Sequence, residues 1–588
     1  MNTRAMIFAG IHARRHFPAK AVGFGLLAWL VVGPLIALLT GPVGLAVTLT
    51  GLGAMLGSTG YWLLVHVVRA QGTRSHMDRS SEHTQYAGGV ASLTHVQEIA
   101  SPKALQLKAD VLRPSLHGVD PRYIDPTELG VCVVTTGRGI FPGQQVWTTC
   151  EMVTLRIGGP RMGKTQSLAC HGLDAPGALL TTSTRSDLAE AVHMARNDRA
   201  VHIMNPTNYG GITSTVRWSV LQGCRDYDTA LRRAGDLVQD GATKDAVFWA
   251  EKARNILAVY LHVAALDGRR VADIPRWLSS EDPRVQDRMA RVLEEKGGHG
   301  GETRAAVLRG HYAEAPNTRK SVVATITPAL DWLANNIARD LGDADPETVT
   351  LNVERFLMES ETLHLIAGTK PVSGVSNLIA CIVAEVAYQA RQLSGDMPGG
   401  RLDPPLTFLL DEAALICPVP LPRWSADMGG RNITMHISIQ SFAQMQERWG
   451  STGASTIKSN VGALIAFGGS QDINELRELS SLSGERRVRT VGEDHDKVNK
   501  KRDGERRGEW RWVPVLSPVE ISSLRPGEVF VRRTGLPTVV GYAPQVWQRK
   551  GWEPLPLTRD PEYGTPDQEF EMPDPLAQKF MDEEVGDR

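Results

Sequence analysis

The residues with the clearest chemistry are eight consecutive ones with the spacing of a phosphate-binding loop, or P-loop. They are Gly158, Gly159, Pro160, Arg161, Met162, Gly163, Lys164 and Thr165, which read G-x-x-x-x-G-K-T. In such a loop the backbone N–H groups bind phosphate oxygens, the lysine reaches the β- and γ-phosphates, and the threonine hydroxyl binds Mg²⁺. We therefore expect all eight residues to bind ATP, with Thr165 also on the metal ion.

The segments that flank this loop favour a nucleotide site over an accidental glycine-rich turn. Residues 153–157 suit a short buried strand, and residues 166–170 can open a helix. A strand, a glycine loop and a helix N-terminus in this order form the context that a phosphate-binding loop requires.

Two acidic residues follow a second apolar segment. Residues 406–410 are predicted to form a buried strand, which ends in Asp411 and Glu412. Asp411 can hold Mg²⁺ through water, and Glu412 can act as the general base that activates the attacking water. An apolar strand that ends in Asp-Glu is a weak signal alone. It gains weight here because parallel strands share one carboxyl edge with the phosphate-binding loop.

Gln440 and Arg431 are the remaining candidates for catalysis. Gln440 ends the predicted strand 434–439, where it can sense the γ-phosphate and orient water; the alternative is a plain polar residue at a strand end. Arg431 lies in a glycine loop, where it can serve as an arginine finger for a neighbouring subunit. The alternative is an ordinary surface arginine.

The elements that must position these residues alternate between strand and helix. Strands are predicted at 131–135, 145–147, 177–182, 201–204, 362–367 and 460–467. Helices are predicted near 96–111 and at 188–196, 377–391 and 473–483. This alternation predicts a doubly wound parallel sheet of the α/β class. Helical periodicity dominates from 219 to 342, with helices expected at 227–238, 248–266, 283–295 and 319–341. We expect these helices to form an all-helical insert between two halves of the sheet.

The N-terminal region predicts a membrane anchor. No charged residue occurs from Ala21 to Val68, and Thr40-Gly41-Pro42 is a turn signal between two stretches of bilayer-spanning length. Arginines and a lysine flank both ends of this region, which places both termini in the cytoplasm. A cleaved signal peptide and a buried hydrophobic hairpin are the alternatives.

Composition adds few constraints on function. The formal net charge of −1 gives no global attraction to nucleic acid, so any DNA affinity must be local. The six cysteines are scattered without metal-ligand spacing, which is typical of a reducing cytosol. The charged segment 486–511 is expected to be a mobile loop, and its basic run at 500–502 is expected to belong to a solvated hairpin or, less favoured, to contact phosphates. The acidic tail after residue 559 is expected to be disordered, and it either docks a protein or aids solubility.

Several of these stretches together resemble the VirD4/TraG-type coupling proteins, the membrane-anchored ATPases of type IV secretion and conjugation. The likeness is carried by residues 158–165, 181–188, Phe248-Trp249, 408–412 and 440–450, of which the last is the most specific. The resemblance implies a transmembrane hairpin, a RecA-like P-loop NTPase core, an all-helical domain and a homo-hexamer with ATP and Mg²⁺ between subunits. It also implies a relaxase-bound DNA strand as substrate and a type IV secretion channel as partner, at the inner (plasma) membrane.

Two departures from the family's pattern stand out. The link between the two predicted spans is only a tight turn, and Pro160, Arg161 and Met162 replace the small polar residues that are usual in the loop. The predicted domains are residues 1–70 (transmembrane hairpin), 71–125 (linker), 126–218 and 346–550 (nucleotide-binding domain), 219–345 (helical insert) and 551–588 (tail).

Three functions compete on this evidence. The first is a coupling ATPase that recruits DNA and drives its transfer. The second is an FtsK-like translocase of double-stranded DNA, which the long helical insert and the lack of an evident C-terminal winged-helix domain disfavour. The third is a membrane receptor for secreted proteins that binds ATP without pumping.

Overall fold

The computed structural model describes residues 90–137, 143–193, 196, 198–239, 244–368, 374–490 and 509–560. The predicted membrane spans and residues 561–588 of the predicted tail lie outside these residues. Within the described part of the chain, no helix has the length and apolarity that a bilayer crossing needs.

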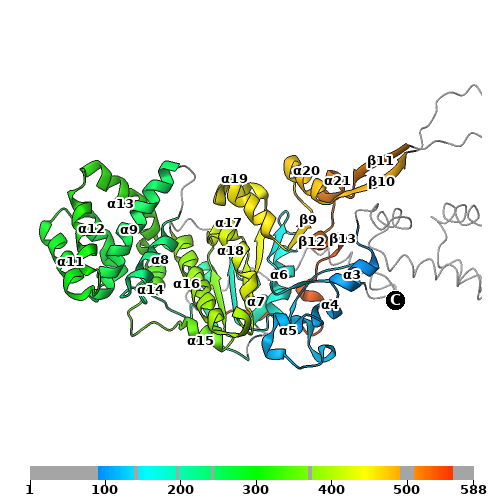
Figure 1. Ribbon diagram of the computed structural model, residues 1–588, viewed down its shortest axis with the longest axis horizontal. Coiled ribbons are helices and arrows are strands. Elements are labelled where there is room, and N and C mark those ends of the chain that lie inside the picture. The colour runs from blue at the N-terminus through cyan, green and yellow to red at the C-terminus, as the bar shows by residue number, and fades with distance from the viewer. Residues whose placement is uncertain are drawn as a thin grey trace, which may run out of the picture. The chain divides into compact units, whose positions relative to one another are not determined.

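An eleven-stranded mixed sheet forms the core, and seven of its strands are parallel to their neighbours (Figure 1). In spatial order they are β9 (Ala463–Phe467), β3 (Thr154–Ile157), β8 (Ile433–Ile439), β7 (Leu406–Leu410), β4 (Leu179–Ser183), β6 (Thr362–Ile366) and β5 (Val201–Met204). Every residue of the six strands from β9 to β6 is buried, which accounts for their near-continuous apolar runs. The predicted parallel sheet is thus confirmed.

Four antiparallel strands extend the sheet beyond β9. They are β12 (Glu528–Arg533), β13 (Leu536–Tyr542), β1 (Gly130–Thr135) and β2 (Gln145–Thr149). The sequence pattern predicts β1 and β2 but not the β12–β13 hairpin. Its two-residue turn contains Gly535 at φ +79°, a left-handed conformation that glycine adopts at little cost.

Helices pack around this sheet and carry the loops of interest. Those that matter for the site are α6 (Lys164–Leu173), α7 (Asp187–His193), α16 (Val375–Asp396), α17 (Ala413–Ile416), α18 (Leu421–Asp427), α19 (Phe442–Asn460), α20 (Ile473–Leu482) and α21 (Pro518–Ser522). Leu168 and Cys170 of α6 are fully buried in a cluster with Leu409 of β7. This cluster ties the helix after the phosphate-binding loop to the strand that leads to Asp411.

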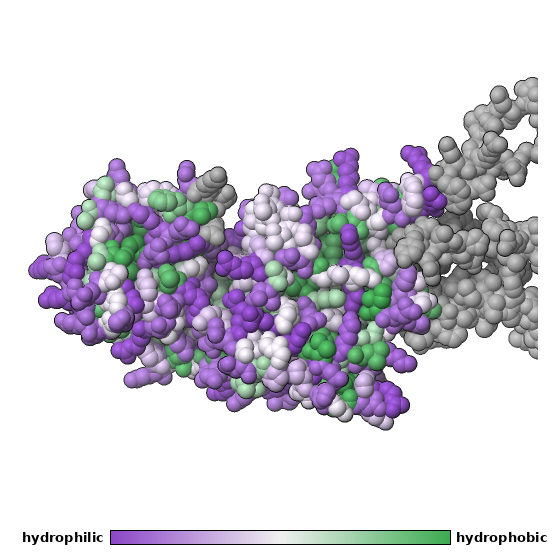
Figure 2. Space-filling view, in the orientation of Figure 1, coloured by the Kyte–Doolittle hydropathy of each residue, from purple (hydrophilic) through white to green (hydrophobic). Residues whose placement is uncertain are grey.

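The insert between the two halves of the sheet is helical, as predicted, and its helices gather beside the sheet in green in Figure 1. They are α8 (Tyr227–Leu237), α9 (Lys244–Leu266), α10 (Ile274–Ser279), α11 (Pro283–Lys296), α12 (Gly301–Ala313), α13 (Pro316–Leu330) and α14 (Asn336–Gly342). On the face drawn in Figure 2, polar side chains cover most of these helices, and apolar ones form only separate patches.

Two predicted helices divide where the sequence offers a cap. The helix expected over 319–341 breaks after Leu330, and Asn335 caps α14 through its side chain. The helix expected near 96–111 is three short ones, α3 (Leu93–Ile99), α4 (Pro102–Gln106) and α5 (Ala109–Leu112). Ser101 caps α4 and Pro102 follows it, a pair that starts a new helix rather than continuing an old one.

The charged segment 486–511 begins and ends in a two-stranded hairpin, as favoured from the sequence, and so is not a loop over its whole length. Residues Glu485–Thr490 (β10) pair in antiparallel register with Glu509–Pro514 (β11), and residues 491–508 lie outside the described part. Arg487 lies opposite Trp512, with its guanidinium 4.9 Å from the ring centroid. Such cross-strand cation–π pairs stabilise a hairpin that charge density alone does not predict.

Candidate nucleotide-binding site

The phosphate-binding loop joins β3 to α6, as the sequence predicts. Gly163 caps α6 at φ +89°, so Lys164 and Thr165 open the helix with their backbone N–H groups at its positive end. Gly159 N–H donates to Gly468 O over 3.0 Å, and this bond fixes the loop to the end of β9. A Cβ atom at Gly159 would lie 2.7 Å from Gly469 O, so this contact requires glycine.

Lys164 folds back over its own loop. Its Nζ donates to the carbonyl oxygens of Gly158 (2.5 Å) and Gly159 (2.8 Å), and the side chain is buried. Burial lowers the pKa of Lys164, while Glu412, Asp411 and other carboxylates favour its charged form. The ammonium group therefore lies where carboxylates and incoming phosphate compete for it.

Thr165 and Asp411 meet although 246 residues separate them. The Thr165 hydroxyl donates to Asp411 Oδ2 over 2.9 Å, and Asp411 Oδ1 is buried without a hydrogen-bond partner among the described residues. Asp411 N–H donates to Thr182 O of β4, which fixes the backbone at the end of β7. A hydroxyl and a carboxylate with an unsatisfied buried oxygen fit Mg²⁺, which takes its other ligands from phosphate and water.

Glu412 and Gln440 face each other across the ends of β7 and β8. Gln440 Nε2 donates to Glu412 Oε1 over 3.0 Å, and Glu412 Oε2 is buried without a partner among the residues described. Glu412 adopts φ +49°, a left-handed conformation that costs energy for a residue with a side chain and is common at functional sites. Burial raises the pKa of Glu412 and the Gln440 amide partly offsets this, which suits a general base.

The middle residues of the loop lie at its outer turn. Pro160 and Arg161 are exposed, with Arg161 at φ +60°. Met162 packs against the apolar cluster of β12 and β13, and its carbonyl accepts the Gly527 N–H over 3.0 Å. The unusual residues of this loop thus dock it onto the antiparallel edge of the sheet.

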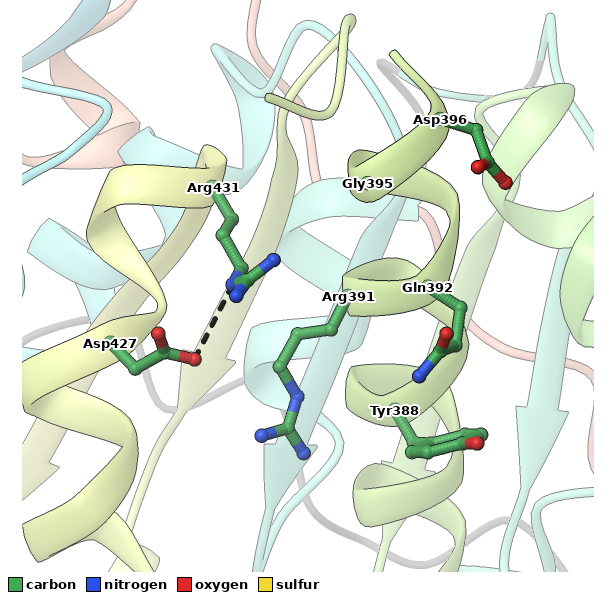
Figure 3. Close-up of a pocket in the computed structure, with 7 residues that line it drawn as sticks. All are labelled: Tyr388, Arg391, Gln392, Gly395, Asp396, Asp427 and Arg431. Atoms are coloured by element: carbon green, nitrogen blue, oxygen red, sulfur yellow. Dashed lines mark ion pairs between the residues drawn. The ribbon is translucent and has the colours of Figure 1, made fainter. Parts of the chain in front are cut away.

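Arg431 lies away from the other candidates in the same chain. It ends a 3-10 turn just before β8, whereas Gln440 follows β8, so a seven-residue strand separates them by roughly 20 Å. Figure 3 shows Arg431 paired with Asp427 (3.4 Å) on the wall of a cavity of about 680 Å³, opposite Arg391 of α16. A role for Arg431 at its own subunit's nucleotide is therefore ruled out by geometry, and a role at a neighbour's stays a prediction.

Two further residues lie near the loop and are not predicted as site residues by the sequence. Glu475 of α20 is buried, and its charge acts on Lys164. Gln545, also buried, lies against Gly163, where a Cβ atom would come within 2.8 Å of its Oε1. Neither belongs to a motif, so only the packing of distant segments reveals them.

A family model and several solved structures match parts of this chain. The family model described as the TraM recognition site of TraD and TraG matches residues 405–526. The solved structure of the bacterial conjugative coupling protein TrwBdeltaN70, unbound monoclinic form, matches with a TM-score of 0.51 and 17% identity over 68% of this chain and 86% of that one. The chain thus resembles the VirD4/TraG-type coupling proteins in both sequence and fold.

A second crystal form of TrwBdeltaN70 shows a similar likeness. The trigonal form of TrwBdeltaN70 in complex with sulphate has a TM-score of 0.50 and 16% identity over 69% of this chain and 87% of that one. TrwB in complex with ADP and Mg²⁺ has a TM-score of 0.49 and 16% identity over 70% and 87%. No curated protein sequence matches the chain. At such identities the likeness to TrwBdeltaN70 shows the fold alone, and the roles of individual residues rest on their geometry here.

Proposed function

We propose that the protein is a P-loop ATPase that couples ATP hydrolysis to conjugative DNA transfer. The observation that carries this proposal is the 2.9 Å contact between Thr165 and Asp411, with Glu412 and Gln440 beside it. Four residues from three separate segments meet at the carboxyl edge of one sheet, in the arrangement that hydrolysis of a nucleoside triphosphate needs.

Each side chain has one task in this scheme. The loop N–H groups and Lys164 hold the β- and γ-phosphates. To reach them, Lys164 gives up its hydrogen bonds to the loop carbonyls. Thr165 and Asp411 would hold Mg²⁺, which neutralises charge on the phosphates. Glu412 accepts a proton from the attacking water, and Gln440 orients that water. Arg431 would reach the nucleotide of a neighbouring subunit.

The biological role rests on the likeness to coupling proteins. The matches to the TraM recognition site and to a conjugative coupling protein support a relaxase-bound DNA strand as substrate and a secretion channel as partner. We further propose that residues 21–39 and 43–68 anchor the protein in the inner membrane with both termini in the cytoplasm, and that the active form is a hexamer.

The test is a transfer assay combined with ATPase measurements on the full chain. Lys164→Ala should abolish nucleotide binding, and Glu412→Gln should keep binding but lower kcat about 10²- to 10⁴-fold, the usual contribution of a general base. Lys103→Ala and Glu359→Gln, both at exposed positions, serve as matched controls.

The outcomes separate the competing functions. DNA transfer that survives Glu412→Gln but not Lys164→Ala would favour a receptor that binds ATP without pumping. ATPase activity that only duplex DNA stimulates would favour an FtsK-like translocase over a coupling protein for single strands. Loss of transfer in both variants, with stimulation by single-stranded DNA, is the result we expect.

A further inference from the structure

A third carboxylate borders the nucleotide site without belonging to any motif. Glu475 lies on the first turn of α20 and is only 4% exposed. Its Oε2 accepts the backbone N–H of Phe442 over 2.8 Å, and its Oε1 has no partner with hydrogen-bond geometry among the described residues. Burying a carboxylate costs free energy, so Glu475 does not simply improve solubility as an exposed carboxylate does.

The bond to Phe442 acts on the segment that carries Gln440. Phe442 begins α19 two residues after Gln440, and Gln440 contacts Glu412. Ser441 already caps α19 by accepting the Gln444 N–H, so the helix has a local cap of its own. Glu475 instead reaches this segment from a different helix and fixes where α19 begins relative to α20.

The turn that leads into α20 contacts the phosphate-binding loop. This turn, between β9 and α20, contains Gly468, whose carbonyl accepts the Gly159 N–H over 3.0 Å. The charge of Glu475 also favours the ammonium form of Lys164. Burial raises the pKa of Glu475 itself, and the Ser470 hydroxyl and the Phe442 N–H offset part of that rise. The turn before α20 is therefore hydrogen-bonded to the phosphate-binding loop, and Glu475 on α20 is hydrogen-bonded to the segment that carries Gln440.

We propose that Glu475 is a positioning residue of the ATPase site, which places Gln440 against Glu412 by holding the Phe442 N–H. This inference rests on the proposed ATPase function. In this proposal the acceptor oxygen of Glu475 and the length of its side chain position Gln440, and its negative charge does not.

Two substitutions separate reach from charge. Glu475→Gln keeps the length of the side chain and an acceptor oxygen but removes the charge. Glu475→Asp keeps the charge but is one methylene shorter, so its oxygens fall short of Phe442. We expect Glu475→Asp to lower kcat about tenfold with KM for ATP changed less than about threefold, and Glu475→Gln to keep kcat within about threefold.

A double-mutant cycle distinguishes positioning from general support of the fold. In a Gln440→Ala background, Glu475→Asp should lower kcat no further, because the residue that it positions is gone. Glu359→Asp is the control, since Glu359 is exposed and lies just after α15 (Val353–Met358), on a different element. This control should leave kcat and KM unchanged.

Several results would overturn the inference. A larger loss with Gln than with Asp would show that the charge matters. An equal loss from Glu475→Asp with and without Gln440 would show a merely structural role. If Glu475→Asp has the same kcat as an active wild-type protein, this inference is wrong, but the proposed ATPase function still stands. A wild-type protein that binds ATP without hydrolysing it would overturn the proposed function and this inference together.

Discussion

At the scale of single residues, the site depends on how buried charges offset one another. Lys164 forms no direct ion pair with a carboxylate of the described residues, yet carboxylates on two separate segments favour its charged form. Burial raises the pKa of Glu412 above its ordinary value, and the Gln440 amide lowers it again in part. Such opposed influences are common where a group must both gain and lose a proton.

The Glu412–Gln440 contact predicts a pH effect. Glu412 must be ionised to accept a proton, so kcat should rise with pH as Glu412 deprotonates, at a pH above its ordinary pKa of 4.5. The Gln440 amide lowers this pKa, so Gln440→Ala should move the acid limb of the kcat profile to higher pH. A profile of kcat between pH 4.5 and 8 for both proteins measures this. An acid limb that stays in place, or moves to lower pH, would contradict the assigned pair.

The glycines of the loop predict a separate effect. Gly163 has φ +89°, and a Cβ atom there would lie 2.8 Å from Gln545 Oε1. Gly163→Ala should therefore weaken ATP binding at least about tenfold through strain in the loop, since positive φ and steric overlap each cost about 1 kcal/mol or more. Titration with a fluorescent ATP analogue measures this. Gly235→Ala, on α8 with open space around its Cα, is the matched control and should bind normally.

At the scale of elements, α6 positions the phosphate-binding loop relative to the rest of the fold. Its apolar side packs against β7 and α7, and a C-terminal segment runs along it from the phosphate-binding loop. On that segment Arg549 pairs with Asp174 near the C-terminal end of α6, and the Trp552 indole donates to Ala191 O of α7 over 2.9 Å. The helix is therefore held at both ends and along its apolar side.

This packing predicts the cost of a cavity under the loop. Leu168 is fully buried in the α6 cluster, so Leu168→Ala should lower the free energy of unfolding by about 2–5 kcal/mol. Leu107→Ala, at a position that is 79% exposed, should change it by less than about 0.5 kcal/mol. Denaturant unfolding of the chain from residue 90 onward compares the two. Equal stabilities would mean that α6 does not belong to the cooperative core.

At the scale of the whole molecule, Arg431 is the residue whose role needs a second copy. It lies at the opposite edge of the sheet from the phosphate-binding loop and pairs with Asp427 beside the cavity in Figure 3. An arginine so placed can serve catalysis only at a neighbour's nucleotide.

Mixed oligomers test this arrangement. Arg431→Ala and Lys164→Ala should each abolish activity in a uniform assembly. Mixed together, they should recover part of it, because a Lys164→Ala subunit still offers its arginine to the intact loop of an Arg431→Ala neighbour. ATPase activity over a series of mixing ratios gives the answer. Absence of recovery at every ratio would leave Arg431 an ordinary surface residue.

The N-terminal region predicts where the protein is found. Residues 21–68 carry no charge over a length that two bilayer crossings require. The full chain should therefore sediment with inner membranes and need detergent for release, whereas a chain that begins at residue 90 should stay in the supernatant. Recovery of the full chain in the supernatant would contradict the predicted anchor.

The sequence alone determined the parts whose signals are local. Glycine spacing specifies the phosphate-binding loop, and mostly apolar runs specify the buried parallel strands, because strands buried on both faces carry few polar residues. The same local reasoning missed the β12–β13 hairpin, and it joined helices that Ser101 and Asn335 divide.

Only the tertiary structure decided which distant residues meet. Thr165 contacts Asp411 and Gln440 contacts Glu412 because β8 lies between β3 and β7, an order that no local pattern contains. The same fold places Arg431 at the opposite edge of the sheet from the phosphate-binding loop, and it places Glu475 beside the site. Strand order follows from how all the apolar faces of the chain are buried together, so it is a property of the whole fold and not of any one segment.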